Sequence, residues 1–242
     1  MNKEKVFFYC KSCGNEHSKW HGQCKYCKEW NSIIEKKVNS LKIKSQTEFG
    51  NYSKKENIPL KISEIDSEDE MRLIVKDDEW NRVLGGGLVL GSVCLISGEP
   101  GIGKSTLLLQ TSMKFNKKVL YVSGEESQRQ IKVRSERIGK ALGQTFILSE
   151  TELEAIFEQI NEINPEIVII DSIQTLHSKM IDGSPGSVTQ IRDCSSELIK
   201  YAKSTGSAVI LIGHLTKDGS IAGPKVLEHM VDVVISFEGD NN

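Results

Sequence analysis

A glycine-rich run directly after a short apolar segment constrains this chain more than any other feature of its sequence. Residues 98–106 read Gly-Glu-Pro-Gly-Ile-Gly-Lys-Ser-Thr and match the pattern G-x-x-x-x-G-K-[ST] in full. The apolar segment 92–97 before the run has the composition of a buried strand, and the three leucines 107–109 after it indicate a helix. A run of this kind between a strand and a helix predicts an α/β fold that binds phosphate.

The residue types of this run suit a triphosphate. Glycines let backbone N–H groups converge on a phosphate, the Lys104 ammonium reaches the β- and γ-phosphates, and the Ser105 hydroxyl is a ligand for Mg²⁺. A helix that begins near Lys104 adds the positive end of its dipole. We expect ATP to be held by the whole run, which comprises Gly98, Glu99, Pro100, Gly101, Ile102, Gly103, Lys104, Ser105 and Thr106.

Acidic residues follow two further apolar runs that are predicted to be neighbouring strands. Asp171 ends the run 166–171, where a carboxylate completes the Mg²⁺ site of a phosphate-binding loop. Hydrolysis also needs a group that polarises water, and Glu125, after the run 118–123, is the candidate general base. The alternatives are that Asp171 caps a helix, and that Glu125 and Glu126 are first-turn acids that favour a helix dipole.

Apolar runs alternate with amphipathic stretches over residues 60–242. The predicted strands are 92–97, 118–123, 166–171, 208–213 and 231–237. Capping boxes are predicted at Thr151 with Glu154 and at Ser187 with Gln190, each at the start of a helix. This order predicts an α/β domain with a mainly parallel central sheet.

Four of the six cysteines form two Cys-x-x-Cys pairs in the first 27 residues. Four thiolates satisfy tetrahedral Zn²⁺ with no open position, so residues 1–34 are predicted to be a zinc module in which metal replaces a hydrophobic core. The predicted ligands are Cys10, Cys13, Cys24 and Cys27. Redox-active thiols are the alternative, as is His17 or His21 in place of one cysteine. The other two cysteines, Cys94 and Cys194, are expected to be small core residues.

Residues 35–59 are rich in Lys, Asn and Ser and are predicted to be a basic linker. Residues 1–60 contain 12 Lys and 6 acidic residues, although the whole chain has a net charge of -2. This basic end either binds phosphate or is a solvated linker. Trp20 and Trp30, which stand among lysines, either belong to a nucleic-acid surface or form the small core of the zinc module.

The sequence contains no segment suited to a membrane. No stretch approaches the roughly 20 apolar residues of a membrane span, and the apolar run 6–9 is shorter than the core of a signal peptide. We therefore expect a cytoplasmic protein, in which clustered thiols hold metal more often than they form disulfides.

Taken together, several stretches resemble the bacterial RadA (Sms) recombination ATPases, whose ATPase core is similar to RecA. The matching stretches are 9–14, 20–32, 82–88, 98–106, 121–127, 130–139, 171–175, 184–194 and 213–232. The resemblance covers most of the chain apart from the linker and residues 69–80. It implies a RecA-like P-loop NTPase that hydrolyses ATP and forms a homo-hexameric ring on single-stranded DNA. Such a ring drives branch migration of branched DNA and works with a recombinase such as RecA.

The resemblance also implies roles for individual residues. By position, Glu125 corresponds to the family's water-activating acid and His214 to the residue that senses the γ-phosphate. The loops 174–186 and 216–225 are similar to the family's two DNA-facing loops. The residues expected to contact DNA phosphates are therefore Arg192, Lys217 and Lys225.

The sequence departs from the family pattern in two places. Residues 75–80 differ from the usual Thr-Gly run before the glycine turn 85–87, which affects how the base or a neighbouring subunit is held. The sequence ends at Asn242, before the family's Lys-Asn-Arg-Phe-Gly motif and Lon-protease-like domain, which indicates a truncated member with impaired turnover. Two alternatives stay open at this point. One is a zinc-, ATP- and DNA-binding module without productive turnover, and the other is a P-loop nucleoside or nucleotide kinase.

Overall fold

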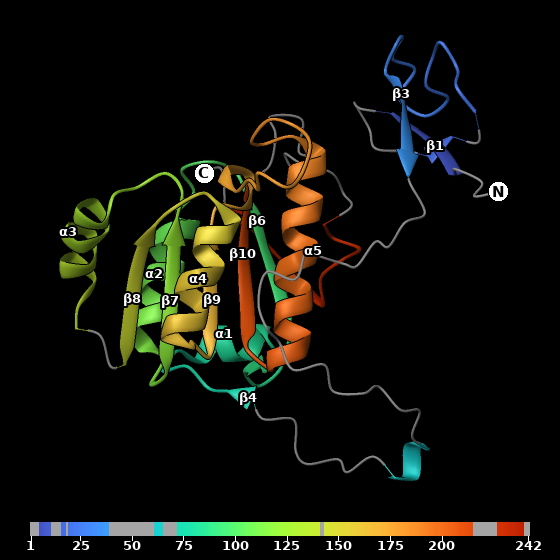
Figure 1. The fold of residues 1–242 in the computed structure, drawn as a ribbon. Coiled ribbons are helices and arrows are strands. Elements are labelled where there is room, and N and C mark those ends of the chain that lie inside the picture. The colour runs from blue at the N-terminus through green and yellow to red at the C-terminus, as the bar shows by residue number, and fades with distance from the viewer. Residues whose placement is uncertain are drawn as a thin grey trace. The chain divides into compact units, whose positions relative to one another are not determined.

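The computed structural model describes residues 5–10, 16–17, 19–38, 61–64, 72–140, 143–214 and 227–239. The chain forms two compact units, Met1–Glu48 and Phe49–Asn242, which are drawn in Figure 1 and described separately below. The domain boundaries expected at residues 34 and 59 stay predictions, because most of the predicted linker lies outside the described residues.

The first unit is a small antiparallel sheet. Its strands are β1 (Lys5–Cys10), β2 (Glu16–His17) and β3 (Ile33–Val38), in the order β2-β1-β3. Among the described residues, the buried cluster of this unit consists of Cys10, Cys24 and Ile33, with Phe8 packed against it. Two of the three buried side chains are thiols, which fits a unit that is stabilised by metal.

The second unit is built on a six-stranded parallel sheet. The strands are β6 (Val93–Gly98), β7 (Lys118–Ser123), β8 (Gln144–Ser149), β9 (Ile167–Asp171), β10 (Ala208–His214) and β11 (Val233–Phe237). Their order is β11-β6-β10-β9-β7-β8, and each neighbouring pair is parallel. The central strands are buried on both faces, as expected when helices cover both sides of a parallel sheet.

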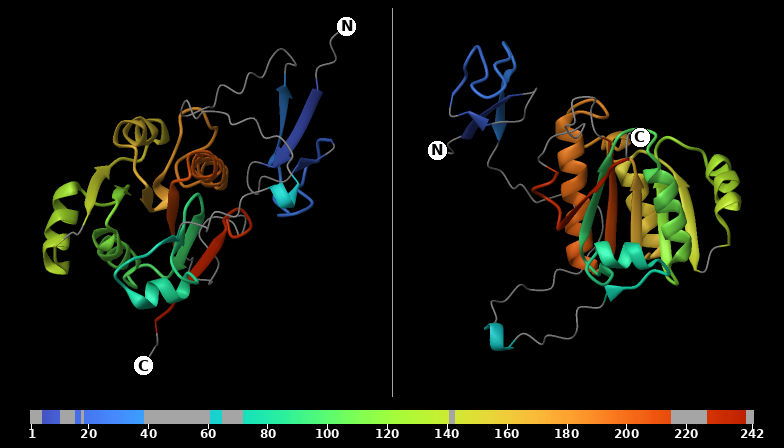
Figure 2. Two further views of the ribbon diagram at one scale, coloured as in Figure 1. Left: turned by 90° about the horizontal axis from the view of Figure 1, so that it is seen from below. Right: turned by 180° about the vertical axis from the view of Figure 1, so that it is seen from behind.

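Helices cover both faces of this sheet (Figures 1 and 2). They are α1 (Asp78–Val83), α2 (Lys104–Lys114), α3 (Gln128–Ile138), α4 (Leu153–Ile163) and α5 (Val188–Thr205). One core cluster joins the sheet to α4 and α5, and the other joins it to α1, α2 and α3. Alternate residues of β6 supply the two clusters, because successive side chains of a strand point to opposite faces. None of the described helices is long and apolar enough to cross a membrane.

A short antiparallel pair of strands lies at the end of the sheet away from the glycine-rich loop. Strand β4 (Arg72–Leu73) pairs with β5 (Leu88–Val89) there. Single turns of 3-10 helix occur at η1 (Ile62–Glu64) and at η2 (Ile173–Thr175), which follows β9 at the opposite edge. Gly87 lies between α1 and β5 with a φ of 128°, and a Cβ there would approach the Leu73 carbonyl oxygen to 2.8 Å. The close pairing of these two strands therefore requires glycine at this position.

The predicted α/β class with a mainly parallel sheet and an N-terminal zinc-ribbon-like unit is confirmed. The strand predicted at 118–123 matches β7, and the other four predicted strands differ from the observed ones by one or two residues at an end. Strand β8 was not predicted, because its residues at this edge of the sheet are only partly buried and give a weak apolar pattern.

The predicted capping box at Thr151 is wrong. Helix α4 begins at Leu153 with Glu152 as its N-cap, and Glu152 makes no side-chain cap hydrogen bond. The Glu150 carboxylate instead binds the backbone just before the helix, since its Oε1 accepts from the N–H groups of Thr151 and Glu152 at 2.7 and 2.9 Å. A complete capping box occurs instead at the start of α3, between Ser127 and Gln130.

The predicted box at Ser187 is half formed. Ser187 caps α5 and accepts from the Gln190 N–H, but the Gln190 side chain turns toward the segment after β9. Its amide nitrogen donates to the carbonyl oxygens of Ser178, Ile181 and Gly183, and its Oε1 accepts from the Ser178 N–H. Gln190 therefore holds the loop between β9 and α5.

Asp77 links α1 to the end of α2. It is the N-cap of α1 and accepts from the Trp80 N–H at 3.2 Å, while Lys114 Nζ donates to its other carboxylate oxygen at 2.7 Å. The hydrogen bond from Lys114, followed by that from Trp80, lowers the pKa of Asp77 below its ordinary value.

Replacing Asp77 with Ala should lower the free energy of unfolding by about 1 kcal/mol, because the helix loses its cap and its ion pair. The folded carboxyl titrates below the unfolded one, so this stabilisation is complete above the unfolded pKa of about 3.9 and is lost as the pH falls through the folded pKa. Urea denaturation at neutral and acidic pH measures both effects. The exposed neighbour Asp78, replaced in the same way, is the control and should change stability by less than about 0.5 kcal/mol. Equal losses in the two variants would contradict the role of Asp77.

Candidate nucleotide site and metal centre

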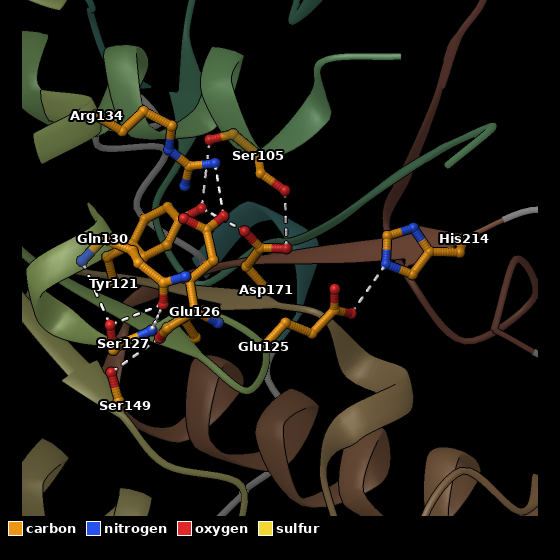
Figure 3. Close-up of polar contacts among 11 residues, drawn as sticks. Ser105, Tyr121, Glu125, Glu126, Ser127, Gln130, Arg134, Ser149, Asp171 and His214 are labelled. Atoms are coloured by element: carbon orange, nitrogen blue, oxygen red, sulfur yellow. Dashed lines mark hydrogen bonds and ion pairs between the residues drawn. The ribbon is translucent and has the colours of Figure 1, made fainter. Parts of the chain in front are cut away.

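The polar residues singled out in the sequence meet at one edge of the parallel sheet. Parallel strands end at the same edge, and the register pairs Ser123 with Asp171 and His214 with Gly98. Figure 3 shows Ser105 facing Asp171 and, beside them, Glu125 facing His214. The fold therefore gathers groups that lie more than 100 residues apart in the sequence.

The glycine-rich loop joins β6 to α2 and carries a buried lysine. Lys104, the first residue of α2, is 3% exposed, and its Nζ donates to the carbonyl oxygens of Gly98 and Glu99 at 2.8 and 2.7 Å. Gly103, the N-cap of α2, has a φ of 110° and offers no side chain to cap the helix. The first N–H groups of α2 thus remain available to an anion.

The pKa of Lys104 depends on its burial and on the acidic groups of the site. Burial lowers the pKa of Lys104, while the charges of Asp171 and Glu125 act in the opposite direction. A buried ammonium needs such partners, because an unpaired charge away from water is costly. Phosphate oxygens of a bound nucleotide are stronger acceptors for this ammonium than the two loop carbonyls.

Asp171 is held by two hydroxyl groups. It is 5% exposed, its Oδ1 accepts from Ser105 Oγ at 3.1 Å, and its Oδ2 accepts from the Tyr121 hydroxyl at 2.5 Å. Burial, together with the negative charge of Asp171, raises the pKa of Tyr121, so the phenol stays a protonated donor. A hydroxyl and a carboxylate that face each other supply the hard oxygen ligands that Mg²⁺ prefers, so these residues fit that ion.

Glu125 and Glu126 have different surroundings. The Glu125 side chain is 56% exposed, its Oε1 accepts from Ser172 Oγ at 3.2 Å, and the same oxygen lies 3.4 Å from His214 Nε2. The Glu126 carboxylate instead forms an ion pair with Arg134 of α3 at 2.7 Å. Glu125 is therefore the acid that faces the site, whereas Glu126 ties the β7–α3 turn to the helix (Figure 3).

A sulfur cluster lies in the N-terminal unit. The Sγ atoms of Cys10, Cys24 and Cys27 lie within 4.8 Å of one another, as the ligands of a single metal ion must. Cys13, the fourth predicted ligand, lies outside the described residues. His17 Nε2 is 3.4 Å from Cys24 Sγ, so a histidine also borders the cluster.

The two remaining cysteines are core residues. Cys94 in β6 and Cys194 in α5 are fully buried, and burial raises the pKa of each thiol to about 12. A thiol that stays protonated at neutral pH is a poor nucleophile and a poor metal ligand. Packing accounts for both residues.

The predicted DNA contacts are described only in part. Arg192 lies on α5 with a side chain 45% exposed, and its Nε contacts Asp193 at 3.0 Å. Lys217, Lys225 and the loop that carries them lie outside the described residues. All three stay predictions.

Sequence reasoning did not identify Tyr121, Ser172 or Arg134 as parts of the site. Tyr121 lies inside an apolar run, where an aromatic residue is expected to be core. Its role depends on which strand β7 pairs with, and no local pattern of residues contains that information. The only sign in the sequence is that Tyr121 carries a hydroxyl group and stands two positions before the end of its strand.

Comparison with known proteins places the chain in a family. A family model described as an AAA domain matches residues 59–220. The chain belongs to this AAA-domain family. A second model, described as a rubredoxin metal binding domain, matches residues 8–35 and therefore spans the cysteines of the sulfur cluster.

Curated relatives of this AAA-domain chain are named DNA repair protein RadA. Those of Halalkalibacterium halodurans and Bacillus subtilis are each 46% identical over 245 residues, which is 100% of this chain and 53% and 54% of the relatives. The Campylobacter jejuni relative is 46% identical over 243 residues, with 99% and 54% covered. The resemblance to RadA is thus confirmed, and the chain spans about half the length of these relatives.

A solved structure with the same fold is the KaiC-like protein PH0186 of Pyrococcus horikoshii. It matches with a TM-score of 0.53 and 20% identity, over 71% of this chain and 83% of that protein. At this identity the match supports the RecA-like fold of the AAA domain alone.

Replacing Cys24 with Ser should abolish zinc binding and unfold the N-terminal unit, because this buried thiol is both ligand and core. Elemental analysis of the purified chain measures the metal. Cys194, replaced with Ser in the same way, is the matched control, since it is a buried cysteine of the other unit and its variant should retain zinc. Full zinc content in the Cys24 variant would contradict a structural metal centre.

Proposed function

We propose that this AAA-domain chain is a DNA-dependent ATPase of recombinational DNA repair. It binds single-stranded DNA and drives branch migration of branched recombination intermediates. The observation that carries the ATPase part is the convergence of Lys104, the Ser105–Asp171 pair and Glu125 at one edge of the sheet. The DNA part is supported by the curated relatives, which are named as DNA repair proteins.

The triphosphate lies along the glycine-rich loop in this proposal. The Lys104 ammonium exchanges the carbonyls of Gly98 and Glu99 for phosphate oxygens, and the N–H groups at the start of α2 donate to the same anion. The exchange keeps the buried ammonium paired throughout, which lowers the cost of emptying and refilling the site.

Ser105 and Asp171 are the residues that would hold Mg²⁺. When bound, the ion neutralises charge that develops on the β- and γ-phosphates. Tyr121 fixes one oxygen of Asp171 through a 2.5 Å hydrogen bond and leaves Oδ1 directed at Ser105. The carboxylate is thereby oriented before the nucleotide arrives, and little reorganisation is needed on binding.

Glu125 is the general base in this proposal. Its exposed carboxylate accepts a proton from the water that attacks the γ-phosphorus, while the bond from that phosphorus to the bridging oxygen of ADP breaks. Ser172 orients the carboxylate by donating to Oε1, and His214 approaches the same oxygen from the end of β10. Residues 216–225 follow β10 in the sequence, so in this proposal His214 links the γ-phosphate to the predicted DNA loop.

The remaining parts of the proposal concern assembly and location. We propose that Arg192, Lys217 and Lys225 contact DNA phosphates, that the chain acts as a homo-hexameric ring in the cytoplasm, and that it works with a recombinase such as RecA. The zinc module has a structural role, because four cysteine ligands leave no open position on the metal. Residues 8–35 match a metal-binding family, which supports this role.

Lys104→Ala should remove ATP binding or reduce turnover by at least about a hundredfold, since the buried cation that pairs with the phosphates is lost. Phosphate release from ATP, measured with and without single-stranded DNA, tests both the ATPase and its stimulation. Lys200→Ala removes an exposed lysine of α5 and should leave turnover unchanged. ATP bound without turnover in the unaltered chain would favour a binding module, and phosphate transfer to a nucleoside would favour a kinase.

Tyr121→Phe deletes one hydroxyl and should raise the Mg²⁺ concentration for half-maximal ATP hydrolysis about fivefold, because Asp171 loses a hydrogen bond worth roughly 1 kcal/mol. Calorimetry of ATP binding without Mg²⁺ should give an unchanged affinity. Tyr201→Phe is the matched control, since this buried hydroxyl donates to the Pro165 carbonyl, away from the site. An unchanged Mg²⁺ requirement in the Tyr121 variant would show that the hydroxyl does not orient Asp171.

A further inference from the structure

Two tryptophans of the N-terminal unit lie on its surface. Trp20 is 56% exposed and Trp30 is 69% exposed, whereas the third tryptophan of the chain, Trp80, is 5% exposed. Among the residues of this unit that the structure describes, the buried cluster is made by Cys10, Cys24 and Ile33. The tryptophans are therefore not the small core of the module, which was one of the two roles that the sequence left open.

Both tryptophan rings lie close to Gly22, which has no side chain. A Cβ built on Gly22 would lie 3.7 Å from the Trp30 ring and 3.9 Å from the Trp20 ring. The backbone fixes this arrangement, because the Asn31 N–H donates to the Gly22 carbonyl at 2.7 Å and Gln23 forms a β-bridge with Trp30. We call Trp20 and Trp30, with Gly22 between them, the tryptophan pair.

Trp20 is anchored at its polar edge. Its indole Nε1 donates to the Ile33 carbonyl at 3.1 Å, so the ring is oriented although more than half of it is exposed. Ordering of these aromatic surfaces before binding reduces the conformational entropy that a ligand must overcome. An exposed, pre-oriented aromatic pair of this kind indicates a binding surface rather than scattered apolar residues.

Positive charge surrounds the tryptophan pair. The described residues 19–34 include three lysines and a single acidic residue. The lysines are Lys19, Lys25 and Lys28, and the carboxylate is Glu29, all of them exposed. The pKa of His21 is lowered by burial and then by the charges of Lys25 and Lys19.

We propose that the tryptophan pair, with Lys19, Lys25 and Lys28, binds unpaired bases of single-stranded DNA by stacking. This inference rests on the proposed function and adds a DNA contact outside the ATPase core. Aromatic rings accept any base, because every base has a flat face, and ammonium groups beside them pair with the phosphates. Bases of a duplex are already stacked on their neighbours, so the surface selects single strands. A purely apolar partner would leave the lysines without counter-charges.

Tryptophan fluorescence of the full 242-residue chain tests the inference directly, because base stacking quenches the indole. We expect titration with a single-stranded oligodeoxythymidylate to quench the emission, and added salt to weaken the apparent affinity. A Trp80→Phe variant removes the buried indole and should keep this quenching. A blunt duplex of the same length should give little or none.

Trp30→Ala should weaken oligonucleotide binding about tenfold and remove part of the quenching. Trp20→Ala should do the same, with zinc content measured in both variants to establish that the module is folded. Binding of the oligonucleotide without quenching, or undiminished affinity in the folded double variant, would overturn the proposal. Either result would show that the oligonucleotide does not stack on the tryptophan pair.

The ATPase proposal is tested separately in the same preparations. ATP hydrolysis without DNA should be unchanged in both tryptophan variants, since both residues belong to the N-terminal unit and the nucleotide site is built from residues of the other unit. Hydrolysis retained together with loss of quenching supports the stacking surface. Absence of hydrolysis in the unaltered chain contradicts the proposed function, and it leaves the fluorescence result to decide the stacking proposal by itself.

Discussion

Parallel pairing of β7, β9, β10 and β6 is the constraint on which the nucleotide site depends. The register sets Ser123 level with Asp171 and His214 level with Gly98, so the residues that follow each strand emerge at one edge. Burial of the strands on both faces makes a slip of register costly, because it would transfer apolar side chains to the opposite face. The positions of the polar groups are therefore as fixed as the core beneath them.

Much of this arrangement follows from the sequence. The conformation of the run 98–106 is predictable, since its glycines and lysine suit one kind of strand-to-helix turn. The strand 118–123 is also predictable, because it is an apolar run with a polar residue at each end. Strand β8 and the capping of α4 were not predicted correctly. The partial burial of β8 depends on its position at the edge of the sheet, which pairing with a distant strand decides. At α4 the Glu150 carboxylate competes locally for the backbone N–H groups of Thr151 and Glu152.

The network around Asp171 marks the limit of sequence reasoning. Tyr121 belongs to an apolar run and gives no sign that its hydroxyl bonds to a carboxylate 50 residues away. Glu125 and Glu126 are adjacent acids of the same type, and their contacts separate their roles, since Glu125 faces Ser172 and His214 whereas Glu126 pairs with Arg134. In the N-terminal unit, likewise, the sequence left two roles for the tryptophans, and their exposure argues against the core role.

In the proposed function, the Lys104 ammonium leaves the carbonyls of Gly98 and Glu99 and turns to a triphosphate whose metal is held at Ser105 and Asp171. A crystal structure of the chain with Mg²⁺ and a non-hydrolysable ATP analogue measures this most directly. We expect Lys104 Nζ to lie within hydrogen-bonding distance of the β- and γ-phosphate oxygens, with Ser105 Oγ on the metal. A nucleotide bound elsewhere, with Lys104 still on the two carbonyls, would contradict it.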